Sequence, residues 1–223
     1  MTFFKILDFL TFLSPVLLLC GILIGIYYYK FLDTVYKILT LYLIVCLCTD
    51  VVSRIYGHFY QNNLIFILLF SLTEVGIFSV LYHTCFLEKK NRLLLVLTTI
   101  ASLYILWEID TLRTIQVQQF QSYSKVADSF LIILLAIVYF FEKIGKNVQA
   151  ELGILRLNSV ILIYFALSLV FFLPINFLIN VTSDLKFYFW GANLMLTLTF
   201  YGFISCEIWK NGLNLKQSHS GSQ

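Results

Sequence analysis

The residues of this chain that could do chemistry are a few ionisable side chains set inside apolar segments. Glu74 stands in the stretch NLIFILLFSLTEVGIFSVLYHTCF, near the middle of an expected membrane span and about 18 Å from either end at 1.5 Å per residue. A carboxyl at that depth cannot extend to water, so it must be protonated or must meet a cation or several donors. Ionisable groups inside membrane segments are functional candidates by default. Glu74 is therefore the first candidate for a switch or ligand-binding residue.

A second candidate pair lies in the preceding apolar segment. Asp50 and Arg54 are four residues apart, so on a helix they share a face and can form an ion pair. An arginine beside a carboxylate could hold an anionic head group, with Asp50 or Glu74 acting as general acid or base. A purely structural ion pair is the alternative interpretation.

Polar residues at similar expected depths occur in two later segments. Asn193 lies at nearly the depth of Asp50, Asn176 lies in the outer part of its segment, and Tyr164 lies in the inner half. The simplest arrangement is a polar pocket that opens outward with Glu74 at its floor. Polar groups also hold membrane helices together without any further role, and that interpretation stays open for Asn193. The ligand-binding hypothesis comprises Glu74, Asp50, Arg54, Asn193, Tyr164 and Asn176.

The elements that must position these residues are membrane helices. The 223 residues are 60% hydrophobic and only 12% charged, whereas soluble domains carry about 25% charged residues. A spanning helix needs about 20 mostly apolar residues. The pattern predicts an all-α polytopic membrane protein, with one seven-helix domain over 1–212 and a disordered cytoplasmic tail over 213–223. The predicted spans are 7–29, 34–56, 62–87, 92–109, 125–145, 157–179 and 186–209.

Basic residues predict the orientation. With the N-terminus outside, ten lysines and arginines fall in cytoplasmic segments and five in outer segments, which satisfies the positive-inside rule. The sequence therefore predicts an outside N-terminus and a cytoplasmic C-terminus. The five assigned to the outside are Lys5, Arg54, Arg113, Lys125 and Lys186.

Motifs of known chemistry are missing. No phosphate-binding loop, dinucleotide fingerprint, nucleophile elbow or zinc-protease motif occurs, and the five cysteines lack metal-ligand spacing. The basic residues lie between the spans and form no nucleic-acid-binding stripe. We therefore expect no cofactor, no metal, no catalytic residues of a known type and no nucleic-acid partner, and the balance is against an enzyme.

Four short segments resemble a family of small seven-helix membrane proteins from Bacteroidota-type bacteria. They are Asn62-Asn63 leading to Glu74, FQSYSKV at 120–126, NSVILIYF at 158–165, and Trp190 with Asn193. Members of that family look like sensory or accessory proteins encoded beside sensor histidine kinases. The resemblance implies a multi-pass protein of a bacterial inner membrane, with a histidine kinase or another membrane protein as partner. It transfers no catalytic residue.

Three functions remain open on the sequence. The first is a sensory or accessory signalling component, in which an outer pocket shifts helix packing and segments 88–92 and 142–156 relay the change to a partner. The second is an intramembrane enzyme that modifies a lipid. The third is a small transporter, which would require access to Glu74 from both sides of the bilayer.

Overall fold

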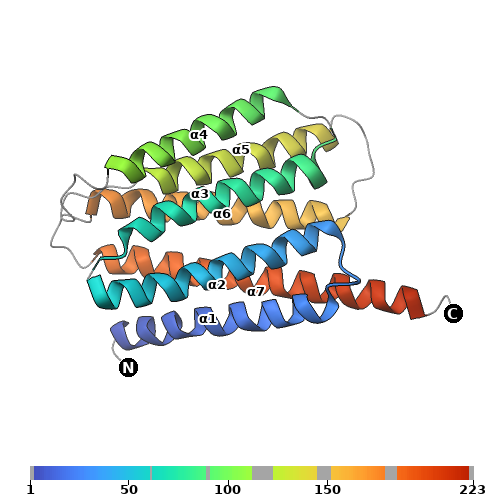
Figure 1. Ribbon diagram of the computed structural model, residues 1–223, viewed down its shortest axis with the longest axis horizontal. Helices are drawn as coiled ribbons and strands as arrows, with labels where there is room; N and C mark the ends of the chain where they lie inside the picture. Colours follow the sequence, from blue (N-terminus) through green and yellow to red (C-terminus); the bar gives the residue numbers. More distant parts are fainter. Residues whose placement is uncertain are drawn as a thin grey trace. The chain divides into compact units, whose positions relative to one another are not determined.

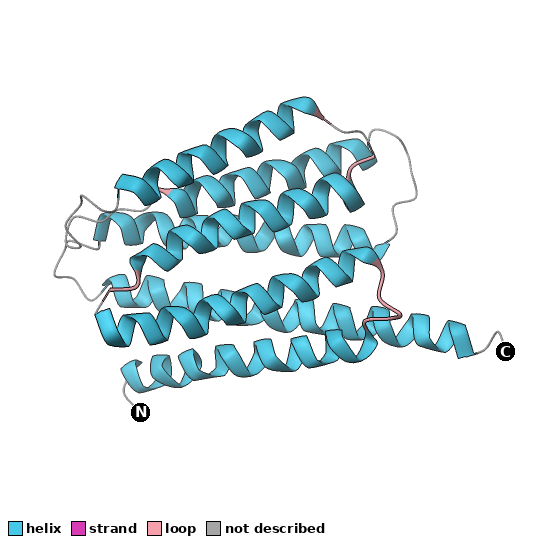
Figure 2. Ribbon diagram, viewed as in Figure 1, coloured by secondary structure: helices cyan, strands magenta, loops and turns pink. Residues whose placement is uncertain are grey.

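The described part of the chain is entirely helical apart from turns and short connections. The computed structural model describes residues 3–60, 62–88, 91–111, 123–144, 152–178 and 185–220, and no strand occurs in these ranges (Figure 2). The helices are α1 (Phe3–Tyr28), α2 (Thr34–Tyr60), α3 (Leu64–Leu81), α4 (Arg92–Thr111), α5 (Ser124–Ile144), α6 (Leu152–Leu178) and α7 (Leu185–Ser220), and a π-helical turn, η1 (Tyr82–Phe86), continues α3 (Figure 1).

Seven of the described helices are long and apolar enough to cross a bilayer. Their apolar stretches run from 20 to 32 residues, and about 20 residues span the hydrocarbon core. The predicted all-α class with seven spans is confirmed for the described chain, which is a polytopic integral membrane protein. The orientation with an outside N-terminus stays a prediction.

Helix α7 is longer than the sequence predicts. It continues to Ser220, so residues 213–220 are helical where a disordered tail was expected. Contacts with the end of α1 hold this extension. The Lys216 ammonium donates to the Tyr27 hydroxyl at 3.3 Å and lies 5.1 Å from the centre of that ring. A side chain that is anchored in this way favours continuation of the helix through Lys216.

The chain divides into two compact units. Unit 1 comprises Met1–Phe59 and Leu194–Gln223, and unit 2 comprises Tyr60–Asn193. Unit 1 contains α1, nearly all of α2 and most of α7, whereas unit 2 contains α3, η1, α4, α5, α6 and the first residues of α7. The single domain predicted over 1–212 stays a prediction.

In unit 1 the helices approach closely at glycines. A Cβ atom placed on Gly21 would collide with Ser205 of α7 and would lie 2.7 Å from Leu43 Cδ1 of α2. A Cβ on Gly25 would lie 2.5 Å from Thr40 Cγ2. The GxxxG pair formed by Gly21 and Gly25 therefore packs α1 against helices of its own chain, as small residues at membrane interfaces allow.

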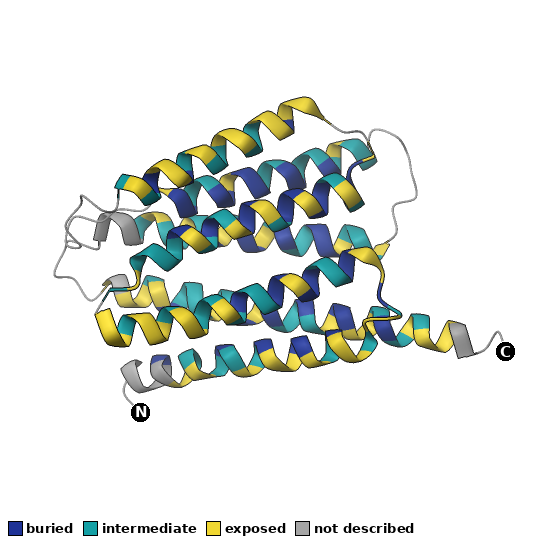
Figure 3. Ribbon diagram, in the orientation of Figure 1, coloured by how far each residue is buried: buried dark blue, intermediate teal, exposed yellow. Residues whose placement is uncertain are grey.

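In unit 2 the central helix is α5. It contacts α3, α4 and α6, and half of its apolar stretch is buried, a larger share than in any other described helix (Figure 3). Helix α4 is the most exposed of the seven and contacts α3 and α5. A polar side chain on the inward face of α5 can therefore find partners on α3, α4 or α6 as well as on α5 itself.

Candidate functional site: a buried lysine shared by two carboxylates

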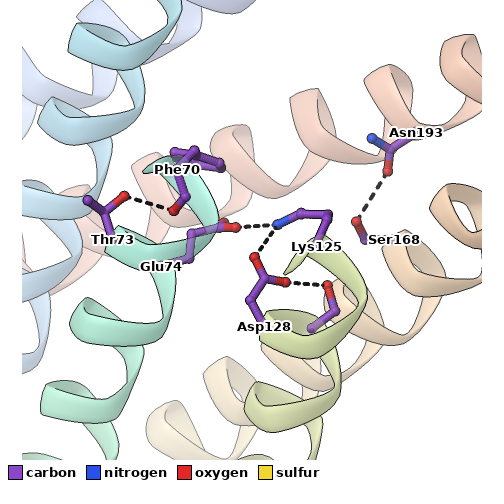
Figure 4. A network of polar contacts seen from close by, with 8 residues as sticks. Phe70, Thr73, Glu74, Lys125, Asp128, Ser168 and Asn193 are labelled. Carbon is purple, nitrogen blue, oxygen red and sulfur yellow. Dashed lines mark hydrogen bonds and ion pairs between the residues drawn. The ribbon is translucent and has the colours of Figure 1, made fainter. Parts of the chain in front are cut away.

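Glu74 meets a cation from another helix. Its side chain lies in the middle of α3 and is completely buried. Carboxylate oxygen Oε2 accepts a hydrogen bond from the ammonium of Lys125, which lies in the first turn of α5 (Figure 4). The sequence required a cation, several donors or a proton for a carboxyl at this depth, and the structure provides the cation.

Lys125 is shared between two carboxylates. Its Nζ also donates to Asp128 Oδ2 at 3.1 Å, and Asp128 Oδ1 accepts a hydrogen bond of 2.9 Å from the Ser129 hydroxyl. Asp128 is completely buried, and Lys125 is the only buried lysine or arginine among the described residues. We refer to Glu74, Lys125 and Asp128 as the Lys125 cluster.

Aromatic rings surround the ammonium of the Lys125 cluster. Lys125 Nζ lies 5.5 Å from the ring centre of Phe70 on α3 and 5.6 Å from that of Phe165 on α6. Both distances are within the range in which a ring face attracts a cation. The ammonium is thus enclosed by two carboxylates and two rings contributed by three helices.

The charges of the cluster do not balance. With all three groups ionised, two carboxylates face one ammonium, and one negative charge is in excess at a buried site. Burying an unpaired charge is costly, whereas a proton on either carboxyl makes the cluster neutral. Because the groups interact strongly, such a proton belongs to the cluster as a whole. The arrangement can therefore bind or release a proton.

Two further predicted residues, Tyr164 and Asn193, make contacts within unit 2. Tyr164 is buried on α6, packs edge-on against Phe165 with ring centres 4.9 Å apart, and lies within electrostatic range of Lys125. Asn193, in the first part of α7, accepts a hydrogen bond of 3.3 Å from Ser168, one turn along α6 from Tyr164 (Figure 4). Tyr164 and Ser168 are four residues apart and share a face of α6, so that face connects the surroundings of Lys125 to Asn193.

The other predicted residues are not part of this arrangement. Arg54 pairs with Asp50 through Nε at 2.9 Å and also donates to the Thr11 carbonyl at 3.0 Å, entirely within unit 1. The predicted pairing on one helix face is confirmed, and a pocket shared with Glu74 stays a prediction. The side chain of Asn176 lies outside the described residues.

Lys125 and Asp128 are residues that sequence reasoning missed. The positive-inside pattern makes Lys125 an outer basic residue at the end of a span, and Asp128 is not among the predicted site residues. A signal was available, because opposite charges three residues apart at the head of an apolar segment share a helix face. The same argument identifies Asp50 and Arg54 as a pair.

The turn after Glu74's helix departs from α-helical geometry. In η1 the amide of Leu87 donates to the Tyr82 carbonyl at 2.8 Å, five residues back. The Tyr82 hydroxyl donates to Asn158 Oδ1 at 2.7 Å, and Asn158 Nδ2 donates to the Ala136 carbonyl at 3.2 Å. These bonds connect η1 to α6 and α5. Single π-turns in helices are frequent at functional sites.

A second lysine–glutamate pair joins the far ends of the same two helices. Lys143 Nζ near the end of α5 lies 2.9 Å from Glu88 Oε1, just after η1. The Glu88 side chain is 44% exposed, in contrast to the buried Glu74. The α3–η1 segment and α5 are therefore paired by charge at two levels, one buried and one accessible.

The site identifies a class of protein and no particular member of it. The chain is a seven-span integral membrane protein with a buried charge cluster, and the described residues contain no group of three histidine, cysteine, aspartate or glutamate side chains placed to hold a metal ion. Comparison with known protein families, with curated proteins and with solved structures gives no match.

Proposed function

We propose that this protein is a sensory or accessory signalling component of a membrane, with the Lys125 cluster as its switch. The observation that carries the proposal is a buried lysine that holds carboxylates from two different helix positions, Glu74 on α3 and Asp128 on α5. Ionisable groups at this depth are costly and commonly mark functional sites. A change in protonation or in bound ligand would alter the attraction between α3 and α5.

The pairing of the two helices supports a route for the signal. The Lys125 cluster acts on α3 and α5 at one level, and the Glu88–Lys143 pair acts on the same elements near their other ends. The π-turn η1 lies between these two levels on the α3 side. A π-turn can convert to an α-helical turn, which changes the rotation of the chain that follows. A weaker Glu74–Lys125 attraction would therefore move η1 and Glu88.

The partner is part of the proposal. The predicted relay segments 88–92 and 142–156 begin beside Glu88 and Lys143, and the predicted orientation places them in the cytoplasm. The family resemblance implies a sensor histidine kinase, or another membrane protein, as the receiver in a bacterial inner membrane. The outward polar pocket around Glu74, Tyr164 and Asn193 would receive the stimulus.

Distance measurement between spin labels tests the switch. The labels are placed at the exposed positions Thr84 in η1 and Phe141 in α5, in a chain whose five native cysteines are replaced. We expect Glu74→Gln to shift the distribution of label distances in lipid nanodiscs, because it removes one charge from the buried pair. The parent chain should also shift between neutral and acidic pH, and the variant should not.

The matched control is Asp50→Asn, which removes a charge from the ion pair of unit 1. This variant should give the distribution of the parent chain. Identical distributions in the parent and in Glu74→Gln would contradict the switch. If the label distances confirm the switch, the partner can be purified with this protein from native membranes. A phosphorylation assay on the captured protein then tests whether the partner is a histidine kinase.

A small proton-coupled transporter is the second candidate, and the excess carboxylate of the Lys125 cluster favours it. A carrier must bind its proton from one side and release it to the other. The purified protein is reconstituted into liposomes that contain a pH-sensitive dye. Under an inward proton gradient a carrier would acidify the liposome interior, and Asp128→Asn would abolish this proton flux. A sensor produces no such flux, so this assay separates the two functions.

A further inference from the structure

A third buried carboxylate of unit 2 lies outside the Lys125 cluster. Glu108, near the end of α4, is 8% exposed. Its Oε2 accepts a hydrogen bond of 2.6 Å from the hydroxyl of Ser124, the first residue of α5. Its Oε1 is buried and has no hydrogen-bond partner among the described residues. A buried carboxylate oxygen without a donor is costly, so Glu108 is suited to bind something positive.

A second unsatisfied oxygen lies at the same level. The Ser71 hydroxyl on α3 is completely buried and also lacks a partner in the described chain. Ser79 and Thr98, 3.4 Å apart, fix the register of α3 against α4. Ser71 lies about 12 Å from Ser79 along its helix, and Glu108 about 15 Å from Thr98 in the same direction, at 1.5 Å per residue. The two oxygens therefore differ by only about 3 Å in depth.

The charge of unit 2 favours a cation at this place. Its buried carboxylates are Glu74, Asp128 and Glu108, and its single buried cation is Lys125, which is committed to the first two. With all four groups ionised, two negative charges are in excess. Buried charges require compensation, and among the described residues of unit 2 Glu108 has neutral donors but forms no ion pair with a basic side chain.

We infer that α3, α4 and α5 form a binding site for a small monovalent cation, either a proton or an alkali metal ion. Glu108 Oε1 supplies the charge, and the hydroxyl oxygens of Ser71 and Ser124 supply neutral ligands. Ser124 donates its proton to Glu108 and keeps its lone pairs for a cation. An all-oxygen donor set suits a hard ion. The phenol of Tyr104, four residues before Glu108 on α4, also lies close to this carboxylate.

The site does not depend on the proposed signalling role. It uses none of the three residues of the Lys125 cluster, and a monovalent cation matches the single negative charge that Glu108 supplies. The Ser124 hydroxyl and the Asp128 carboxyl are one helical turn apart on α5. A charge bound at Glu108 would therefore change the electrostatic potential at the Lys125 cluster.

Carbodiimide labelling of the wild-type chain tests the site. Dicyclohexylcarbodiimide modifies protonated carboxyl groups in apolar surroundings, and mass spectrometry locates the adduct. We expect labelling of the peptide that contains Glu108, decreasing from acidic to neutral pH. Sodium chloride should slow the labelling about fivefold relative to choline chloride at equal ionic strength if the ion is an alkali metal, because bound sodium displaces the proton.

Each outcome has a consequence. Protection by sodium assigns an alkali metal ion, and pH dependence without sodium protection assigns a proton. Labelling that is absent at every pH, or that responds to neither pH nor sodium, overturns the site. Ser71→Ala should weaken the sodium protection while leaving the adduct in place. Glu108→Gln must remove the adduct from that peptide, whereas Glu88→Gln, at the exposed pair, must not affect it.

Discussion

Each unit contains an ion pair, and the two pairs differ in how they form. In unit 1, Asp50 and Arg54 lie four residues apart on α2, with side chains 26% and 39% exposed, so the pair forms as soon as α2 forms. In unit 2, Glu74 and Lys125 are 51 positions apart in sequence, and both are buried. That pair exists only when α3 and α5 are packed together. The first pair is a local property of one helix, and the second reports on tertiary packing.

The packing around the two pairs differs in the same sense. Unit 1 brings helices together at Gly21, Gly25 and Gly212, where no side chain could be added without moving a neighbour. Unit 2 joins its helices through side chains, with the ring of Phe78 edge-on to Phe165 at 5.0 Å and Tyr82 bonded to Asn158. At the glycines of unit 1 neighbouring side chains lie directly against the backbone, whereas the side chains that join unit 2 can change rotamer, so unit 2 is the better candidate for a moving part.

The largest expected effect is that of Lys125→Met. Removing the ammonium leaves Glu74 and Asp128 buried without a cation, which should destabilise the protein by about 3–5 kcal/mol. The matched variant Lys143→Met breaks the accessible pair of the same helices and should cost less than about 1 kcal/mol. Unfolding in mixed micelles with increasing denaturing detergent measures both. Equal losses would remove the distinction between the buried and accessible pairs.

The next effect concerns unit 1. Gly21→Leu inserts a side chain where even a Cβ collides with Ser205, so we expect a loss of about 1–3 kcal/mol from overpacking. Gly202→Ala on α7 is the control, because nothing lies within 4 Å of a Cβ at that position. The control should be neutral or slightly stabilising. A Gly21→Leu variant with the thermal unfolding temperature of the parent would show that α1 packs elsewhere.

Tyr82→Phe should have a smaller effect. It removes the hydroxyl that bonds Asn158 Oδ1 and leaves a buried acceptor unsatisfied, at a cost of about 1–3 kcal/mol and at the lower end if Asn158 reorients. Amide hydrogen exchange should then accelerate across η1 and the facing part of α6. If amide exchange in both segments of the variant is as slow as in the parent chain, the Tyr82–Asn158 hydrogen bond does not hold the π-turn.

The smallest effect is expected from Asp50→Asn. The pair is partly exposed and Arg54 keeps its hydrogen bond to the Thr11 carbonyl, so the loss should be at most about 1 kcal/mol. The same detergent-unfolding assay applies. A loss as large as that of Lys125→Met would show that the Asp50–Arg54 pair is buried and that the ion pairs of the two units do not differ in strength.

The helices were predictable because the bilayer imposes a simple requirement. Twenty apolar residues in succession identify a span whatever surrounds it, and all seven predicted spans correspond to described helices. Ends were less predictable, since Lys216 keeps α7 helical through contacts with Tyr27, which a local pattern does not contain. The pairing of Asp50 with Arg54 was also predictable, because both residues belong to one helix.

The partners of Glu74 were not predictable in the same way. A carboxyl in the middle of a span indicates that its charge must be compensated, but the lysine that compensates it is in another helix. Lys125 stands at the start of α5, where a basic residue normally marks the membrane surface, so its position suggested a topological role instead. Only the packing of α3 against α5 turns that residue inward, and packing depends on every side chain of both helices.

The π-turn η1 makes the phase of a helix adjustable by one residue. Its wide turn accommodates one residue more than an α-helical turn would, so the chain beyond Phe86 is rotated relative to a continuous α-helix. Deleting a single codon within 82–86 would restore the regular turn and reorient everything that follows toward the next helix. In evolutionary terms, residues 82–86 set the direction in which Glu88 and its neighbours face, and a different residue sets the position of the buried charge. The direction can therefore change while Glu74 stays in place.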